Sequence, residues 1–318
     1  MPVSSVPVSS GPASTVPPGV PIVDSHQHVW DPSAHAQPWL DSDEALSPLR
    51  RIFSITELAP QAAAAGVVST VVIQTITEPG ETPELLALAR SHPLVAAVVG
   101  WADLTAAEVV AALDDLRSLP GGEYLAGVRH PLLTEPDGDW LDRPDVRRGL
   151  TALAAAGLSF DLVLQPSQLP GAVRAAASLP ELTFVLDHLG NVDVETGPDL
   201  DESWAAPFRD LAALPNTVCK LSGILSVPGR RPSPAQFLAG PKAPRPAVDH
   251  LRPYVDLALE SFGPERLMFG SDWPVCTLSA SYAAVVAAAA ELTRDLSGPE
   301  QAAIWDGTAR SVYRIAAA

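Results

Sequence analysis

Residues 22–30 read IVDSHQHVW, an apolar run that ends in two histidines one residue apart. The run predicts a short buried strand, Ile22–Ser25, with His26 and His28 at its carboxyl end. Because side chains two residues apart on an extended strand point the same way, both imidazoles face one side. Two neutral imidazoles can hold a divalent ion such as zinc. Taken alone, the pair fits two solvated histidines at a polar strand end better than it fits a metal site.

Short apolar runs like this one recur along the chain, separated by alanine- and leucine-rich stretches with helical spacing. Runs that are apolar on both faces are typical of parallel strands covered by helices. Gly66 and Gly157 follow alanine runs, where helices are expected to end. The seven further predicted strands are Thr70–Gln74, Val95–Gly100, Leu125–Arg129, Ser159–Leu164, Thr183–Asp187, Thr217–Leu221 and Arg266–Gly270. The predicted helices are Ile55–Ala65, Pro83–Ser91, Ala106–Leu119, Asp145–Ala156, Pro170–Ser178, Ala205–Leu214, Val248–Phe262 and Ala280–Arg294.

Eight strands in strict alternation with eight helices predict a single-domain α/β fold, a (β/α)₈ TIM barrel over residues 20–318. A doubly wound sheet is the alternative, because alternation alone does not show that the sheet closes. Residues 1–19 are rich in proline, serine and glycine and predict a disordered tail. The 318 residues, 47% of them hydrophobic, suffice for one large core.

The charge balance excludes some classes of partner. Asp and Glu number 37 against 20 Lys and Arg, a formal charge of −17, and so acidic a surface repels nucleic acid and anionic membranes. No apolar run approaches the roughly 20 residues of a membrane span, and the N-terminus lacks the features of a signal peptide. Cys219 and Cys276 form no metal motif and suit a reducing cytoplasm. We expect a small-molecule substrate, and dimers are common among such barrels, so a homodimer is one expectation.

Two more strands deliver reactive side chains to the end where the first strand delivers its histidines. The sixth predicted strand is followed by His188 and the eighth by Asp272. In a barrel, these strand ends surround one mouth. Three histidines and an aspartate supply ligands for one metal ion and a carboxylate that can take a proton from water. The combination predicts an active site at His26, His28, His188 and Asp272.

Other strand ends and rim loops offer groups for binding a substrate. Arg129 could hold a carboxylate or polarise a carbonyl, and Lys220 could stabilise an oxyanion. Alternatively, both cations pair with Asp24 or Asp187 inside the barrel. Aromatic walls suit a sugar or a flat ring, although single tryptophans often only anchor loops. The remaining candidates for substrate binding are Trp30, Gln74, Trp101, His130, Gln165 and Ser222.

Four of the connections that follow strands are long. They cover about residues 30–54, 130–144, 188–204 and 223–247. The last is rich in proline and holds four basic residues, and it is either a lid over the barrel mouth or a surface excursion. No GxSxG, GxxxxGK[ST] or GxGxxG motif points to another kind of catalytic site.

Six sequence blocks, in order and spread over nearly the whole chain after the tail, resemble a known family. They are IVDSHQHVWD, AGVRHPLL, FDLVLQP, FVLDHLGN, CKLSG and ERLMFGSDWPV. The family is the amidohydrolase-2 branch of the amidohydrolase superfamily, and the blocks are most similar to its sugar-lactonase group of fuconolactonase-like and rhamnonolactonase-like enzymes. The resemblance implies a TIM-barrel hydrolase that opens a five- or six-membered lactone of a sugar acid.

The resemblance also implies roles for single residues. His26 and His28 match the family's first-strand pair, His188 its sixth-strand histidine, and Asp272 the eighth-strand aspartate that activates water. Arg129 and His130 match the fourth-strand pair that contacts substrate, and Lys220 and Ser222 match the seventh-strand block.

One departure from the wider superfamily concerns the number of metal ions. Members with two metals carry a bridging lysine on strand four and a histidine on strand five, where this chain has Arg129-His130 and Gln165. A two-metal centre is therefore not expected. Relatives in this branch work with one metal or with none, and the sequence leaves both possible; one divalent ion, zinc, is our expectation.

Three other functions remain compatible with these residues. The same site could catalyse nonoxidative decarboxylation of an aromatic or unsaturated acid, or hydrolysis of another cyclic ester. It could also open an amide, because ester and amide hydrolysis share this machinery. The third alternative is a barrel that binds a ligand without turnover, against which the presence of all four central residues argues.

Overall fold

The computed structural model describes residue 16 and residues 19–192, 200–223 and 248–316. Most of the predicted tail, and all of the predicted loop 223–247 except residue 223, lie outside the described residues. Within the described residues, no helix combines the length and the apolar character that crossing a bilayer requires.

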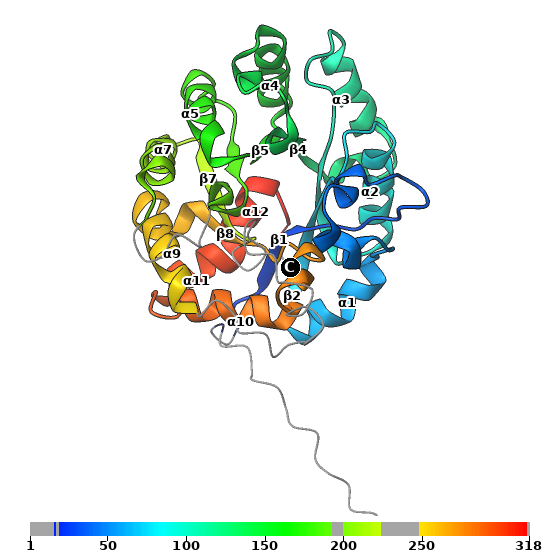
Figure 1. Ribbon diagram of the computed structural model, residues 1–318. Helices are drawn as coiled ribbons and strands as arrows, with labels where there is room; N and C mark the ends of the chain where they lie inside the picture. Colours follow the sequence, from blue (N-terminus) through cyan, green and yellow to red (C-terminus); the bar gives the residue numbers. More distant parts are fainter. Residues whose placement is uncertain (1–15, 17–18, 193–199, 224–247, 317–318) are drawn as a thin grey trace, which may run out of the picture.

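Eight parallel strands form one sheet in which neighbours in sequence are neighbours in space (Figure 1). The first and last strands meet where Gln27 bridges Trp273, so the sheet curls round on itself. Consecutive order without a reversal excludes the doubly wound sheet and confirms the (β/α)₈ barrel. The strands are β1 Ile22–Gln27, β2 Val67–Ile73, β3 Val95–Gly100, β4 Leu125–Pro131, β5 Ser159–Val163, β6 Phe184–Leu186, β7 Thr217–Leu221 and β8 Leu267–Phe269.

Helices surround the sheet (Figure 1). Those that match the predicted helices are α1 Ile55–Ala64, α2 Glu81–Ser91, α3 Val109–Ser118, α4 Pro144–Ala156, α5 Leu169–Ser178, α7 Glu202–Ala212, α9 Val248–Phe262 and α10 Tyr282–Thr293. Capping residues account for some differences from the predicted bounds. The Asp201 side chain accepts a hydrogen bond from Ser203 N, and Ser281 caps α10 by accepting from Ala284 N, so both helices begin next to a cap.

The chain ends in helical segments that the hydrophobic pattern did not predict. They are α11 Gly298–Ala302, a π-helical turn Ala303–Gly307 and α12 Thr308–Tyr313. Helix α12 contacts β1 and β8, which are neighbours, and also β4 across the barrel from them, so it covers one end of the barrel. Its residues Ala309 and Tyr313 join the apolar layer inside the barrel.

The interior changes from apolar to charged along the strands. Val185 on β6 and Val218 on β7 belong to the apolar layer that α12 covers. Asp187 and Lys220 come two residues later and therefore point to the same side of the sheet. Both are completely buried. The fold thus places charged side chains inside the barrel, directly below the carboxyl ends of the strands.

Candidate active site

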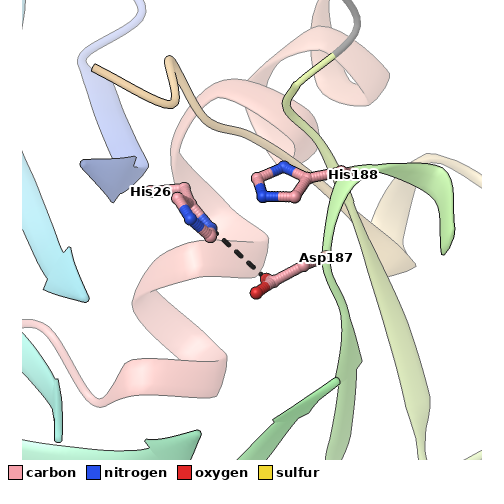
Figure 2. A group of neighbouring side chains, drawn as sticks. All are labelled: His26, Asp187 and His188. Atoms are coloured by element: carbon pink, nitrogen blue, oxygen red, sulfur yellow. Dashed lines mark ion pairs between the residues drawn. The ribbon is translucent and has the colours of Figure 1, made fainter. Parts of the chain in front are cut away.

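The four residues predicted at the mouth come together. His26 Nε2 lies 3.1 Å from His28 Nε2, and Asp272 Oδ1 lies 3.6 Å from His28 Nε2 and 3.9 Å from His26 Nε2. The His188 ring lies 4.4 Å from the His26 ring, centre to centre. Figure 2 shows His26 and His188 on facing elements, with Asp187 beside them. Residues more than 240 positions apart in the chain thus form one cluster.

The backbone turns sharply at two of these residues. His188 has a φ of 56° and Asp272 a φ of 57°, in the left-handed region that side chains with a Cβ rarely adopt. Each follows the end of a strand of only three residues, β6 or β8. Asp272 N also donates to His26 O at 2.8 Å, which ties this turn to β1. Such strain is typical of functional sites, where the surrounding structure holds it.

Hydrogen bonds orient the His28 ring. His28 Nδ1 lies 2.8 Å from Ile73 O, and because a carbonyl only accepts, Nδ1 carries the proton. The lone pair of Nε2 then faces His26 and Asp272. Burial lowers the pKa of His26, His28 and His188, which favours neutral rings.

A buried network of charges lies beneath the histidines. Lys220 Nζ lies 2.6 Å from Asp161 Oδ2 and 3.0 Å from Asp187 Oδ1, and Arg129 Nη1 lies 3.2 Å from Asp187 Oδ2. Burial opposes ionisation of Asp187, but the charge of Lys220 and the contact with His26 outweigh it and hold the pKa of Asp187 well below the usual range. Tyr313 Oη donates to Asp161 Oδ2 at 2.7 Å, which connects α12 to the network.

The sequence left two roles open for Arg129 and Lys220, substrate binding or ion pairing inside the barrel. Their contacts in the structure are internal ion pairs, and Asp187 is the partner of both. Asp24 pairs with neither. It accepts hydrogen bonds from Ser271 N at 2.8 Å and from Tyr282 Oη at 2.9 Å instead. Arg129 also makes hydrogen bonds to Gln74, whose Oε1 accepts from Nε at 3.0 Å and whose carbonyl accepts from Nη2.

In the described part of the chain, Asp272 lies outside this network of ion pairs. Two cations, Arg129 and Lys220, offset Asp161 and Asp187. Among the residues that the structure describes, no lysine or arginine lies within ion-pair distance of Asp272, which is 5% exposed. A carboxylate in this position can accept a proton or bind a cation.

His26, His28 and Asp272 fit a divalent metal ion. Their facing atoms are 3.1 to 3.9 Å apart, and ligand atoms in a tetrahedral zinc site lie about 3.3 Å from one another. The His28 tautomer presents Nε2, as a ligand must. A second group, His26, Asp187 and His188, is also close enough, but Lys220 and Arg129 already neutralise Asp187.

The other predicted binding residues fall into two groups. Ser222 belongs to the site, since its buried hydroxyl lies 2.8 Å from His188 Nδ1. Trp101 and His130 contact each other and the loop that follows β4. Trp101 Nε1 donates to His130 Nδ1 at 3.4 Å, and the His130 ring stacks on Trp140 at 4.2 Å. Glu135 lies 3.1 Å from the other ring nitrogen of His130.

The three remaining predicted binding residues make most of their contacts with other parts of the protein, although the Trp30 ring also lies 6.4 Å from the His28 ring, centre to centre. Trp30 is buried and donates to Leu49 O at 3.2 Å and Arg51 O at 2.9 Å, as a loop anchor does. Gln74 is buried and holds Arg129. Gln165 is exposed, and its amide lies 3.4 Å from Leu133 O.

Sequence reasoning missed three features of this site. Asp161 was not singled out, although a charged residue inside the apolar strand FDLVL was a signal. Asp187 was considered only as a partner for a cation, and the structure places it beside His26 (Figure 2). Tyr313 carried no signal, because nothing in the sequence shows that α12 folds against the barrel interior.

The fold and the mouth together define a barrel enzyme with a histidine–aspartate centre. The chain belongs to the amidohydrolase-2 family, whose model, described as amidohydrolase, matches residues 23–315. This confirms the family resemblance.

The chain is similar along nearly its whole length to proteins from Burkholderia. An L-fucono-1,5-lactonase of Burkholderia multivorans is 36% identical over 92% of this chain and 96% of its own, and one of Burkholderia ambifaria is 33% identical over 92% and 95%. A crystal structure of a Burkholderia multivorans amidohydrolase with bound zinc superposes with a TM-score of 0.81 at 34% identity, covering 93% of this chain and 100% of that one.

Proposed function

We propose that this enzyme opens the ring of a sugar-acid lactone by attack of water on the ring carbonyl, with Asp272 as the general base. The observation that carries the proposal is the position of Asp272, a buried carboxylate 3.6 to 3.9 Å from nitrogens of two histidines and, among the described residues, with no lysine or arginine within ion-pair distance. The names of the relatives from Burkholderia multivorans and Burkholderia ambifaria support a lactone as substrate.

Each step of this reaction conserves atoms and charge. Asp272 takes a proton from water as the water oxygen bonds to the carbonyl carbon. The tetrahedral intermediate then breaks its bond to the ring oxygen, and that oxygen receives the proton held by Asp272. The product is an open-chain hydroxy acid. Its carboxyl group ionises at neutral pH, so each turnover releases one proton to the solution.

We propose that one divalent ion, zinc, is held by His26, His28 and Asp272, with His188 as a further ligand or a close neighbour. A bound ion of this kind polarises a carbonyl and lowers the pKa of water. Ser222 orients His188 through the contact to Nδ1, so the other ring nitrogen remains for the site. The relative with bound zinc supports this choice of ion.

The two cations have different proposed roles. Arg129 Nη1 lies 3.4 Å from His26 Nε2, and the Arg129 side chain keeps 8% of its surface exposed, so it is the cation nearer to a substrate. We propose that Arg129 stabilises the oxyanion. Lys220 is completely buried and contacts His26 Nδ1 at 3.2 Å, so it acts by positioning. Trp101 and His130 would contact the sugar ring.

Two proposals concern the setting of the enzyme. Cys219 and Cys276 are both buried and unpaired, which supports a reducing cytoplasm. The homodimer remains a prediction, to be tested by the mass of the purified protein in solution.

Acid release at constant pH tests the proposed reaction. Purified protein is incubated with a panel of five- and six-membered sugar-acid lactones, and base uptake is followed. We expect base uptake above the spontaneous rate for at least one lactone, together with its loss in Asp272→Asn. Carbon dioxide release from an aromatic acid, with no activity on any lactone, would favour the decarboxylase instead.

Metal dependence needs a separate measurement. The protein is stripped with a chelator, its metal content is determined, and single ions are added back. We expect about one zinc ion per chain and recovery of activity with zinc. Full activity of protein that contains less than a tenth of an equivalent of metal would contradict the proposed role of the ion.

A further inference from the structure

The first residue of α2, Glu81, is a carboxylate buried next to the active-site strands. It is 5% exposed. Both of its oxygens accept from Thr75 N, at 2.9 and 3.0 Å, and Oε2 accepts from Ile76 N at 3.2 Å. The Thr75 hydroxyl donates to Oε1 as well. All of these bonds go to the segment that contains the last residue of β2 and the three residues after it, which we call the β2 rim segment, residues 73–76.

The β2 rim segment holds two residues of the active site. The Ile73 carbonyl accepts from His28 Nδ1, and Gln74 accepts from the Arg129 guanidinium through its side chain and its carbonyl. The side-chain amide of Gln74 is oriented in turn, because its Nε2 donates to Ile76 O at 3.0 Å. A continuous path of hydrogen bonds therefore runs from Glu81 through Ile76 and Gln74 to Arg129.

A carboxylate is an unusual group for a purely structural contact here. Burying a charge is costly unless hydrogen bonds or a partner charge offset the loss of water. Among the described residues, Glu81 has no lysine, arginine or histidine within ion-pair distance, and burial raises its pKa. Four hydrogen bonds from Thr75 and Ile76 and the place of Glu81 in the first turn of α2 both favour the ionised carboxylate, against the effect of burial.

We propose that Glu81 is a positioning residue of the active site, which fixes the orientation of Arg129 and the ring of His28 through the β2 rim segment. A neutral amide in its place would have one accepting oxygen and an NH₂ group facing backbone donors. The segment would then shift, and Gln74 would lose its alignment with Arg129. The expected loss of catalytic activity rests on the proposed lactone hydrolysis. The expected loss of alignment between Gln74 and Arg129 does not.

The first experiment compares Glu81→Gln with Glu84→Gln, the same change one turn further along the same helix. Glu84 is exposed and contacts only His35 among the described residues. We expect kcat of Glu81→Gln to fall about 10- to 100-fold, the usual effect of losing a group that orients an active-site residue, with KM changed less than about threefold. The control should keep both constants. Unchanged kcat in Glu81→Gln would overturn the proposal.

The second experiment does not depend on the substrate. In wild-type protein, the Arg129 Nε proton is buried and bonded to Gln74, so its ¹⁵N–¹H signal should exchange slowly with water. The signal is assigned by its loss in Arg129→Lys. We expect fast exchange in Glu81→Gln and slow exchange in Glu84→Gln. If no lactone is hydrolysed, this measurement still decides the positioning role, and slow exchange in Glu81→Gln contradicts it.

A milder variant covers the case in which Glu81→Gln does not fold. Thr75→Val keeps the shape of the side chain and removes only its hydroxyl bond to Glu81. It should speed exchange of the Arg129 Nε proton and lower kcat by a few-fold. If neither the exchange rate of the Arg129 Nε proton nor kcat changes in Thr75→Val, the proposal is overturned.

Discussion

Asp272 combines three properties that no other described carboxylate of the site shares. It lies at the mouth, no described lysine or arginine is within ion-pair distance of it, and its φ is positive. Asp161 and Asp187 lie nearby but are neutralised by Lys220 and Arg129. The difference between these carboxylates is therefore set by their neighbours rather than by residue type.

Replacing Asp272 by Asn should remove the base and keep the shape. Asparagine tolerates the positive φ of this position better than most residues, so the fold should persist. We expect kcat to fall about 10²- to 10⁴-fold, the range usual for a general base. Acid release from the best lactone measures the loss, and thermal melting checks the fold. Turnover close to that of the wild type would show that Asp272 is not the general base.

Asp24 offers a prediction about stability and pH. Burial raises its pKa from 3.8 to about 6, although hydrogen bonds from Ser271 and others oppose the rise. A carboxyl with a raised pKa in the folded state stabilises the fold fully below about pH 3.8. That contribution is lost as the pH rises through about 6. The stability lost between these two pH values is about 3 kcal/mol.

The variant Asp24→Asn removes this titration. Its amide oxygen can accept from Ser271 N, while its NH₂ can donate to Tyr282 Oη. We expect the variant to unfold at higher denaturant than wild type at pH 8 and to lose that advantage at pH 4. Urea unfolding at both values measures it. If the variant and the wild type differ in stability to urea by the same amount at pH 8 and at pH 4, Asp24 does not titrate in this range.

At the scale of residues, the sequence predicted those side chains that follow directly from strand ends. His26, His28, His188 and Asp272 are such residues, and the structure brings them together. Lys220 and its partner Asp161 could not be paired from sequence, because the pairing depends on which residues of β5 and β7 face inward at the same height.

At the scale of elements, the strands were predictable because each is an apolar run of the right length between polar turns. The structure confirms all eight, with ends that differ by at most three residues. The segment after residue 297 was not predicted, since its alanine-rich sequence contains Gly307 and passes from α-helix through a π-helical turn into α12. Packing on β8 and β1 supports this irregular helix, and the sequence pattern does not report packing.

The end of β7 allows a prediction about the space around His188. Gly223 has a φ of 64°, and a Cβ at this position would lie 2.8 Å from the His188 ring. Gly223→Ala should therefore destabilise the fold and displace the ring, with a clear loss of kcat.

The matched control for Gly223 is Gly263→Ala. Gly263 has a φ of 71° and a ψ of 158°, a region that is essentially restricted to glycine, and nothing within 4 Å of an added Cβ, so a substitution there carries a backbone cost of about 1–3 kcal/mol without crowding another side chain. We expect both variants to melt at lower temperature and only Gly223→Ala to lose activity. Equal activity of the two variants would show that His188 tolerates the shift.

At the scale of the whole molecule, α12 connects the end of the chain to the charges under the active site. Tyr313 Oη donates to Asp161, and the aromatic ring lies 5.4 Å from Lys220 Nζ. Tyr313→Phe should leave a buried carboxylate with one donor fewer and lower the free energy of unfolding by about 1–3 kcal/mol. Tyr124→Phe, at a half-buried tyrosine, is the control. Urea unfolding compares them, and equal stability of the two variants would refute the role of Tyr313.

The contact between the first and last strands determines when the proposed active site can form as the chain folds. His26 and His28 lie on one side of the seam where β1 meets β8, and Asp272 lies on the other, tied across it by Asp272 N to His26 O and by His28 N to Trp273 O. A chain still emerging from the ribosome therefore cannot assemble the proposed catalytic centre until its eighth strand has joined its first. If these residues form the catalytic centre, activity reports on completed barrel closure, and an incomplete barrel is inactive.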